Sequence, residues 1–326
     1  MPARLIANDL GVLIGHWSDP VAATGCTVVL CPRGAVGGIA IRGGAPCSRE
    51  TEILAPMRGV APRLVHGAVL AGGSVFGLAA TDGVVRWLSE RGIGLQTGHA
   101  CIPIVPALGL YDLGIGDPER RPDAAAGCAA CAAAGASAAE GRVGAGTGAT
   151  VGKMGQNRSM KGGLGSASIT LPDGLVVAAL VAVNAVGDVI DPATGNVVAG
   201  VRTDDGKGLA DARTLLRSGA LLRRAQPRSG ENTTIGVVAT NAKLTKVQAQ
   251  KVAQMAHDGF ARAIYPVHTQ VDGDTVFALA TGTDKAPPNM LLIGSLAADV
   301  TAEAIVRAAR AATGLPNLPA ARDRAR

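Results

Sequence analysis

Aromatic side chains are scarce in this chain: only seven of its 326 residues are Trp, Tyr or Phe. A protein that binds nucleic acid by stacking bases on aromatic rings is therefore not expected. The core must instead be built from Ala, Val, Leu and Ile, which supply most of the 48% hydrophobic content. The 45 glycines are nearly twice the usual share and indicate closely packed backbones and many tight turns.

Long apolar runs and export signals are also missing. No apolar run of membrane-spanning length is free of Gly or charge, and the first residues do not resemble a signal peptide. We therefore expect a cytoplasmic protein that makes no membrane contact and keeps its six cysteines as free thiols. Cys128 and Cys131 form a CxxC pair without a second pair or a nearby His. This spacing favours buried helical thiols over a metal or redox site.

The net charge of +6 is concentrated in two stretches. Residues 211–232 carry five arginines against Asp211 and Glu231, and residues 320–326 carry three arginines against Asp323. Both stretches are polar or flanked by Pro. They indicate a solvated linker over 200–232 and a frayed tail over 315–326, and they argue against a nucleic-acid partner.

Apolar periodicity predicts a layered α+β protein. Strands are expected over 26–31, 37–41, 64–70 and 175–183, and helices over 74–88 and 123–140. Beyond the linker, strands are expected over 235–240, 275–280 and 290–293. Thr245 and Gln248 form a capping box that predicts a helix start, and a last helix is expected from about Thr301 to Gly314.

The glycine-rich motifs do not identify an established catalytic site. Residues 72–77 have one residue too many between Ser and Gly for a nucleophile elbow. Residues 144–149 fit a relaxed dinucleotide fingerprint, but an Ala-rich helix precedes them where a strand is required. The five histidines show no ligand spacing and do not suggest a Ser-His-Asp triad.

Asn232, Thr233 and Thr234 stand immediately before the predicted strand 235–240. Taken alone, they indicate an ordinary turn into a strand. A Thr hydroxyl at the start of a buried strand, just after a polar linker, is also what a self-cleaving N-terminal-nucleophile enzyme requires. Attack on the preceding carbonyl and hydrolysis of the ester free the Thr amine, which can then serve as the base for its own hydroxyl.

Residues 232–245 resemble the processing site of the self-cleaving D-aminopeptidase and β-aminopeptidase family. The Asn-Thr junction is most similar to the branch of the endo-type 6-aminohexanoate-oligomer (nylon oligomer) hydrolases. Further stretches resemble the family in the same order along almost the whole chain, and their joint order is specific. They are residues 42–51, 70–78, 104–117, 144–153 and 161–165.

The resemblance implies a role for several residues. Thr233 matches the nucleophile, and Asn232 matches the residue on the acyl side of self-cleavage. Asn184 matches an amide that binds the developing oxyanion. Asp272 and Asp274 match the acidic pair of the nylon-oligomer branch, which would orient the Thr ammonium and relay its proton.

A lysine is expected beside the nucleophile, where its charge would favour the free Thr amine. Lys153 fits the family spacing better than Lys161, although both stay open. Cys47, Ser48 and Asn241 depart from the family pattern, which leaves the details of the pocket open.

The resemblance therefore implies a four-layer αββα sandwich made as one precursor. Cleavage would give residues 1–232 and residues 233–326 as two associated chains of a homotetramer, with no cofactor and no metal. The expected activity is hydrolysis of small or oligomeric amides through a Thr233 acyl-enzyme. Alternatives are an aminopeptidase for β- or D-amino acid N-termini, an acyltransferase of the ornithine-acetyltransferase type, and an uncleaved Gly-rich ligand-binding protein.

Overall fold

The computed structural model describes residues 7–58, 64–155, 157–219 and 230–324. These residues form one nine-stranded sheet in which β1 (Leu13–Asp19) pairs with β2. The other strands follow the spatial order β10 (Gly163–Thr170), β11 (Val176–Val183), β14 (Ile235–Thr240), β16 (Thr275–Ala280), β2 (Thr24–Ile41), β4 (Val65–Ala71), β7 (Ala107–Gly109) and β3 (Ser48–Arg49). Three smaller sheets accompany it. The first contains β12 (Asp188–Ile190), β13 (Val197–Ala199) and β15 (Ile264–Tyr265). The second pairs β5 (Leu95–Gln96) with β6 (Cys101–Ile102), and the third pairs β8 (Thr150–Val151) with β9 (Met160–Lys161).

Strand β2 joins the two halves of the large sheet. Its first part pairs with β1 and β4, and its last part, from Val36 to Ile41, pairs with β16. The register shifts between Leu30 and Ala35, where Pro32 and Gly34 interrupt the apolar pattern. The sequence predicted two separate strands here, and the bulge explains why one continuous strand looked like two.

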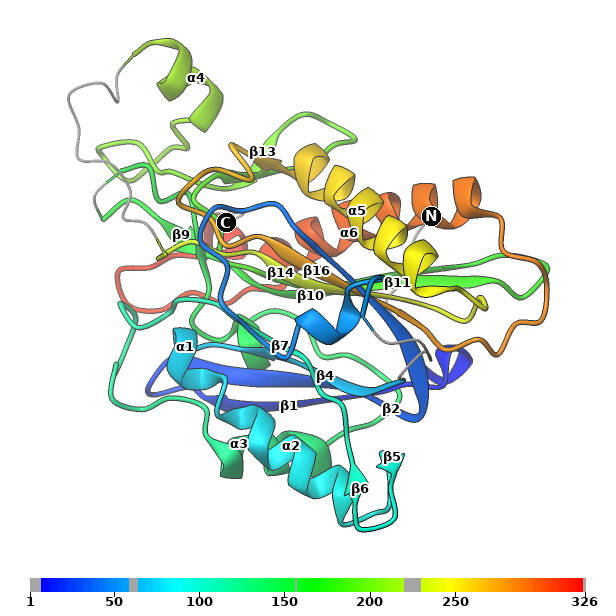
Figure 1. The fold of residues 1–326 in the computed structure, drawn as a ribbon. Coiled ribbons are helices and arrows are strands. Elements are labelled where there is room, and N and C mark those ends of the chain that lie inside the picture. The colour runs from blue at the N-terminus through cyan, green and yellow to red at the C-terminus, as the bar shows by residue number, and fades with distance from the viewer. Residues whose placement is uncertain (1–6, 59–63, 156, 220–229, 325–326) are drawn as a thin grey trace.

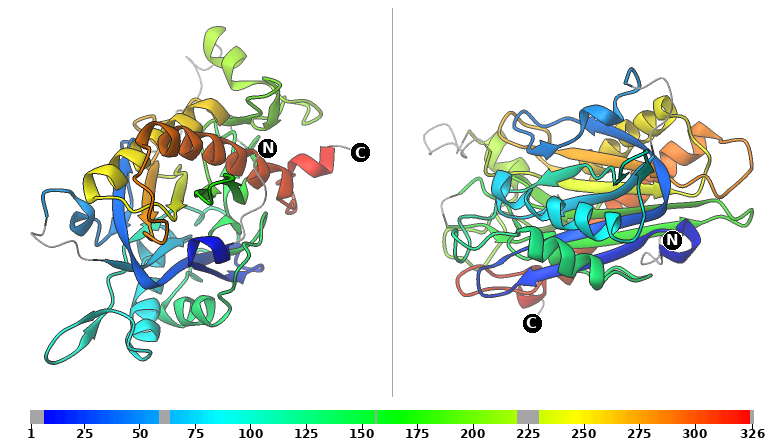
Figure 2. Two further views of the ribbon diagram at one scale, coloured as in Figure 1. Left: turned by 90° about the vertical axis from the view of Figure 1, so that its right-hand side faces the viewer. Right: turned by 60° about the horizontal axis from the view of Figure 1, so that its bottom comes forward.

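Helices cover both outer faces of this sheet. Helices α5 (Lys246–Ala263) and α6 (Met290–Ala311) pack against each other and against β2, β10, β11 and β16. Helices α2 (Ala80–Ser89) and α3 (Ala124–Ala132) pack together, and α3 contacts β1 and β2. Figure 2 shows the yellow and orange helices α5 and α6 on one side and the cyan and green helices α2 and α3 on the other. The short helices are α1 (Ser74–Gly77) and α4 (Ala212–Arg217).

The core is divided by the alternation of side chains along the strands. In β11, Val177 and Val181 belong to the cluster under α5 and α6, whereas Val176 and Leu180 face β4 and β7 in a second cluster. A third cluster lies between β4 and the helices α2 and α3. Small residues allow this close packing: a Cβ at Gly165 would overlap the backbone of Ala304 and Ala308 in α6.

Local signals explain where the expected elements differ from the observed ones. Strands β14 and β16 and the Thr245 capping box are confirmed. The strand predicted over 290–293 is wrong, because Asn289 caps the first turn of α6 there through a bond from the Leu292 N–H. The helix predicted over 123–140 ends at Ala132. Cys128 and Cys131 lie in this helix, and all six cysteines are free thiols.

The described parts of the two charged stretches, 200–219, 230–232 and 315–324, make specific hydrogen bonds and buried contacts. Residues 220–229 of the predicted linker, which carry three of the five arginines in 211–232, lie outside the described residues. Asp188 anchors the segment that leads to the candidate cleavage site, since its two carboxylate oxygens accept the Val201 and Ala212 N–H groups at 2.7 Å each. Burial raises the pKa of this carboxyl to about 6. At the other end, Ala320 is buried and the Pro319 carbonyl accepts the Lys161 N–H at 2.9 Å. The described part of the tail is therefore packed rather than frayed.

Candidate active site

Thr233 lies at the entrance of β14 and is almost completely buried, with 2% of its surface exposed. Its N–H donates to the Asn184 carbonyl at 2.9 Å, and its Oγ1 donates to the Asn232 carbonyl at 2.6 Å. The nucleophile predicted from the sequence is thus in contact with the bond that it would break. In the uncleaved chain its hydroxyl is closed off from solvent.

The parallel pairing of β14 with β16 brings the acidic pair to this bond. Asn232 forms an isolated bridge with Asp272 just ahead of the paired strands. The Gly273 N–H donates to the Asn232 carbonyl at 2.8 Å, and the Thr234 N–H donates to Asp274 Oδ1 at 2.8 Å. Residues about 40 positions apart in the sequence are therefore held side by side at the start of two parallel strands.

The two carboxylates have different partners. Asp272 Oδ2 accepts the N–H and the hydroxyl of Thr269 at 3.1 and 2.5 Å, and Oδ1 accepts the Val186 N–H at 3.3 Å. Asp274 Oδ2 accepts the N–H and the Nδ1 of His268 at 3.0 and 2.9 Å. Burial, and secondarily the neighbouring charge of Asp274, raises the pKa of Asp272.

Asn184 follows β11 and connects most of the site. Its carbonyl accepts the Lys153 Nζ at 3.1 Å in addition to the Thr233 N–H, and its Oδ1 accepts the same Nζ at 2.8 Å. Its Oδ1 also accepts the Thr150 N–H at 2.9 Å, which fixes the orientation of the amide. Nδ2 donates to the Tyr111 carbonyl at 2.9 Å and points toward the Glu231 carbonyl at 3.4 Å.

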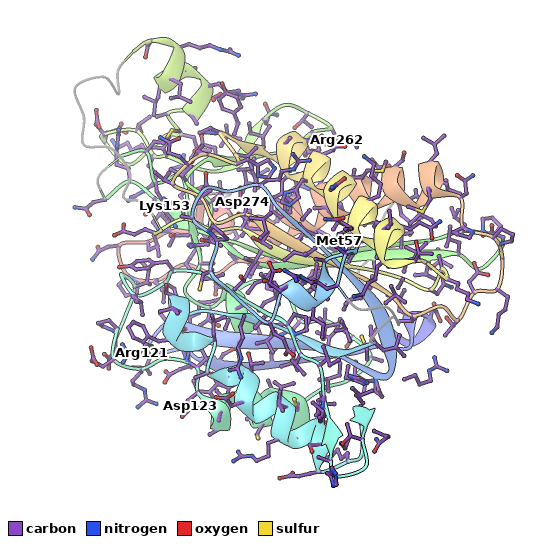
Figure 3. All side chains as sticks on the ribbon, viewed as in Figure 1. Met57, Arg121, Asp123, Lys153, Arg262 and Asp274 are labelled. Carbon is purple, nitrogen blue, oxygen red and sulfur yellow. The ribbon has the colours of Figure 1, made fainter. Side chains whose placement is uncertain are left out.

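Of the two lysines that the sequence left open, Lys153 is the one that contacts Asn184. Its Nζ also donates to the Glu231 carbonyl at 2.8 Å, one residue before Asn232. Three oxygen acceptors match the three protons of an ammonium group. Burial lowers the pKa of Lys153 to about 7. Figure 3 labels Lys153 and Asp274 in the same region, where β14 and β16 begin.

Lys161 contacts the turn next to the site, whereas Lys153 contacts Asn184 itself. Lys161 is fully buried, and its Nζ donates to the carbonyls of Gly146, Ala149 and Gly162. Burial lowers its pKa to about 7 as well. Its contact with Ala149 supports the turn whose next residue, Thr150, holds the Asn184 amide.

The glycine-rich turn at 72–74 and the stretch 104–117 support the site instead of forming sites of their own. Asp112 follows Tyr111, and its carboxylate accepts the Thr24 hydroxyl at 2.8 Å and the Gly73 N–H at 2.6 Å. Burial raises the pKa of this carboxyl to about 6. The bonds tie the stretch 104–117 to the turn at 72–74, so that the Tyr111 carbonyl is held against Asn184.

Sequence reasoning missed two parts of this arrangement. The Gly273 N–H could not be recognised, because a backbone donor carries no residue signature. His268 was treated as one of five scattered histidines, although it lies only six residues before Asp274 in the connection that leads into β16.

Among the described residues, no three His, Cys, Asp or Glu side chains gather as a metal site would require. None of the helices described here is long and apolar enough to cross a membrane. A cavity of about 810 Å³ opens elsewhere, lined among others by Ile115, Arg202 and Leu318, and none of the candidate catalytic residues lines it.

A model of peptidase family S58 matches residues 6–319, nearly the whole chain. The chain belongs to peptidase family S58. It is 41% identical to an uncharacterized aminopeptidase of Mycobacterium tuberculosis (strain H37Rv), over 96% of this chain and 95% of the relative. It is 32% identical to the 6-aminohexanoate-oligomer endohydrolase of Paenarthrobacter ureafaciens, over 92% of this chain and 84% of the relative.

Solved structures of two aminopeptidases have the same fold. The β-aminopeptidase of a Burkholderia species superposes with a TM-score of 0.66 at 25% identity, over 96% of this chain and 88% of that one. The L-aminopeptidase D-Ala-esterase/amidase of Ochrobactrum anthropi gives 0.67 at 20% identity, over 98% and 91%, and is described as a variant of the Ntn hydrolase fold. The family resemblance is confirmed, and it supports a hydrolase that acts on amide bonds.

Proposed function

We propose that this S58 protein cleaves itself between Asn232 and Thr233 and then hydrolyses amides through the freed Thr233. The observation that carries the proposal is the placement of Thr233 Oγ1 and the Gly273 N–H on the same carbonyl oxygen, that of Asn232. A hydroxyl beside a carbonyl that is already polarised by a buried N–H is arranged for attack on that carbonyl.

In the self-cleavage step, Thr233 Oγ1 bonds to the Asn232 carbonyl carbon and loses its proton. Negative charge collects on the Asn232 oxygen, where the Gly273 N–H stabilises it. The bond from this carbon to the Thr233 nitrogen then breaks as the nitrogen takes up the proton that Oγ1 released, which leaves an ester. Water hydrolyses the ester, and the products are an Asn232 carboxylate and a Thr233 residue with a free amine and a free hydroxyl.

The matured site would use the same groups on a substrate amide. The Thr233 amine takes the proton of Oγ1, which attacks the substrate carbonyl and expels the amine half. The Asn184 amide donates to the oxyanion, and Asp272 exchanges a proton with the Thr233 amine; its raised pKa brings it closer to neutral pH. Lys153 stabilises the free-base form of that amine by its charge. Water then releases the acyl group from Oγ1.

The proposal includes the two-chain form of the αββα sandwich, residues 1–232 with residues 233–326, and its assembly into a homotetramer. The placement of α5 and α6 on one outer face and of α2 and α3 on the other supports the layer order.

For the substrate, we propose linear amide oligomers of the 6-aminohexanoate type. Relatives with that named activity match 92% of the chain at 31–32% identity. A second candidate is an aminopeptidase for β- or D-amino acid N-termini. It is favoured by the 41–42% identity to proteins named as uncharacterized aminopeptidases.

One comparison of substrates tests this choice. The matured protein is incubated with 6-aminohexanoate oligomers and, in parallel, with β-alanyl and D-alanyl amides, and amine release is measured. Thr233→Ala serves as the blank. Faster release from the oligomers supports the first candidate, and faster release from the aminoacyl amides moves the assignment to the second. Transfer of the acyl group to an added amine in preference to water would indicate an acyltransferase instead.

A further inference from the structure

His268 directs two donors at a single oxygen of Asp274. Its backbone N–H lies 3.0 Å from Asp274 Oδ2, and its ring Nδ1 lies 2.9 Å from the same atom. A carboxylate in its ionised form only accepts hydrogen bonds, so the tautomer that fits this contact is the one with a proton on Nδ1. The other oxygen, Oδ1, accepts the N–H of Thr234, the residue after the nucleophile.

The backbone of His268 is in an unfavourable conformation that makes this double contact possible. Its φ is +57°, in the left-handed region, which is uncommon outside Gly, although Asn, Asp and His adopt it more often than other residues. A conformation of this kind costs on the order of 1 kcal/mol and persists only where the surroundings enforce it. Here it bends the chain before β16 so that the N–H and the ring of one residue reach the same oxygen.

Packing holds the imidazole against the carboxylate. Phe260 of α5 stacks on it with ring centroids 5.8 Å apart, and His257, one turn earlier, meets it edge-on at 4.7 Å. His257 itself contacts the Ala40 carbonyl of β2 through Nε2. The His268 Nε2 is buried and has no hydrogen-bond partner among the described residues. The polar contact that the ring makes there is the one to Asp274.

We propose that His268 is a positioning residue, which fixes the Asp274 carboxylate so that Oδ1 holds the Thr234 N–H and sets the register of the nucleophile. This inference rests on the proposed function of Thr233. It also assigns different roles to the carboxylates of Asp272 and Asp274. Each carboxylate accepts three bonds on its two oxygens, but the three bonds of Asp274 are all 3.0 Å or shorter, which suits a structural task. Asp272 Oδ1 has one long contact of 3.3 Å and keeps capacity for a proton.

Two substitutions at His268 separate the ring donor from the backbone. Asn and Gly both tolerate a positive φ. In His268→Asn, an amide nitrogen is bonded to Cγ as Nδ1 is in His, so it can still donate to Asp274. In His268→Gly the donor is lost. Asn317→Gly is a matched control, because Asn317 also has a positive φ, +64°, and is exposed outside the site.

The variants are made by cell-free synthesis, and intact mass follows self-cleavage over time. We expect His268→Asn and Asn317→Gly to cleave within about threefold of the wild-type rate, and His268→Gly to cleave at least about tenfold more slowly. Rescue by Asn is the readout that a purely structural role of the large ring would not produce.

The outcomes distinguish the two levels of the proposal. A wild-type chain that stays intact overturns the proposed function, and the role of His268 with it. If the wild type cleaves and His268→Gly cleaves equally fast, only the role of His268 is overturned. If His268→Asn is as slow as His268→Gly, the Nδ1 donor is not what the site needs, and the inference is also wrong. A slow His268→Asn variant overturns the inference even if the Gly variant does not fold.

Discussion

Replacing Gly273 by Ala tests how tightly the candidate site is built around the proposed cleavage bond between Asn232 and Thr233. A Cβ at this position would lie 2.5 Å from the Ala45 carbonyl oxygen and 2.8 Å from Thr233 Oγ1. The φ of Gly273 is outside the left-handed region, so the substitution acts through these contacts and not through backbone strain. Since ordinary contacts begin near 3.4 Å, Thr233 or the Gly273 backbone must move by about half an ångström or more.

Such a shift affects both groups that contact the Asn232 carbonyl. Misplacement of reacting groups by about 1 Å costs about 100-fold in rate, and loss of one oxyanion donor costs about 100- to 1000-fold. We therefore expect Gly273→Ala to slow self-cleavage by about 100-fold, with a loss of about 1–3 kcal/mol in stability from overpacking. The assay is intact mass over time after cell-free synthesis, with far-UV circular dichroism to verify folding.

Gly98→Ala provides the control for this experiment. A Cβ at Gly98 would meet no atom within 4 Å, and its φ is also outside the left-handed region. We expect this variant to cleave like the wild type. A folded Gly273→Ala chain that cleaves as fast as Gly98→Ala would mean that the contacts at Gly273 do not position Thr233, contrary to this prediction.

Three further predictions concern the lysines and a helix cap. Lys153→Met removes the donor to Asn184 and to the Glu231 carbonyl, and we expect about 100-fold slower self-cleavage by intact mass; an unchanged rate would exclude Lys153 from the site. Burial lowers the pKa of Lys161 in the folded state to about 7, from its ordinary value of 10.5. Between about pH 7 and pH 10.5 the unfolded state therefore binds one more proton at Lys161 than the folded state does, and the free energy of unfolding rises with pH. In urea titrations of the uncleaved Thr233→Ala chain, Lys161→Met should reduce that slope by about 1.4 kcal/mol per pH unit between about pH 7.5 and 8.5; an unchanged slope would contradict the burial of its charge. Thr245→Ala removes the capping box of α5 and should lower the free energy of unfolding by about 1 kcal/mol in the same titrations, whereas no change would show that the cap is dispensable.

Elements with strong local signals were predictable from the sequence. Strands β14 and β16 are short apolar runs between polar turns, and α5 begins with a capping box at Thr245. The start of α6 was not predictable in this way. Residues 290–293 are a four-residue apolar run, and periodicity cannot distinguish a strand from a buried first helical turn over that length.

The candidate site was predictable only as far as side chains reveal it. The family resemblance matched Asp272 and Asp274 to an acidic pair that acts with Thr233. The Gly273 N–H and His268 depend on the parallel pairing of β14 with β16 and on a left-handed residue in a connection, and both are properties of the folded chain. The preference for Lys153 over Lys161 likewise needed the contacts of Asn184.

The central claim is that Thr233 becomes an N-terminal nucleophile. Its most direct test is the intact mass of the purified chain together with N-terminal sequencing of any smaller species. We predict two species, residues 1–232 and residues 233–326, with the second beginning Thr-Thr-Ile-Gly, and an intact chain in Thr233→Ala. A wild-type chain that remains a single species of 326 residues, or a Thr233→Ala chain that still breaks after Asn232, would contradict this prediction.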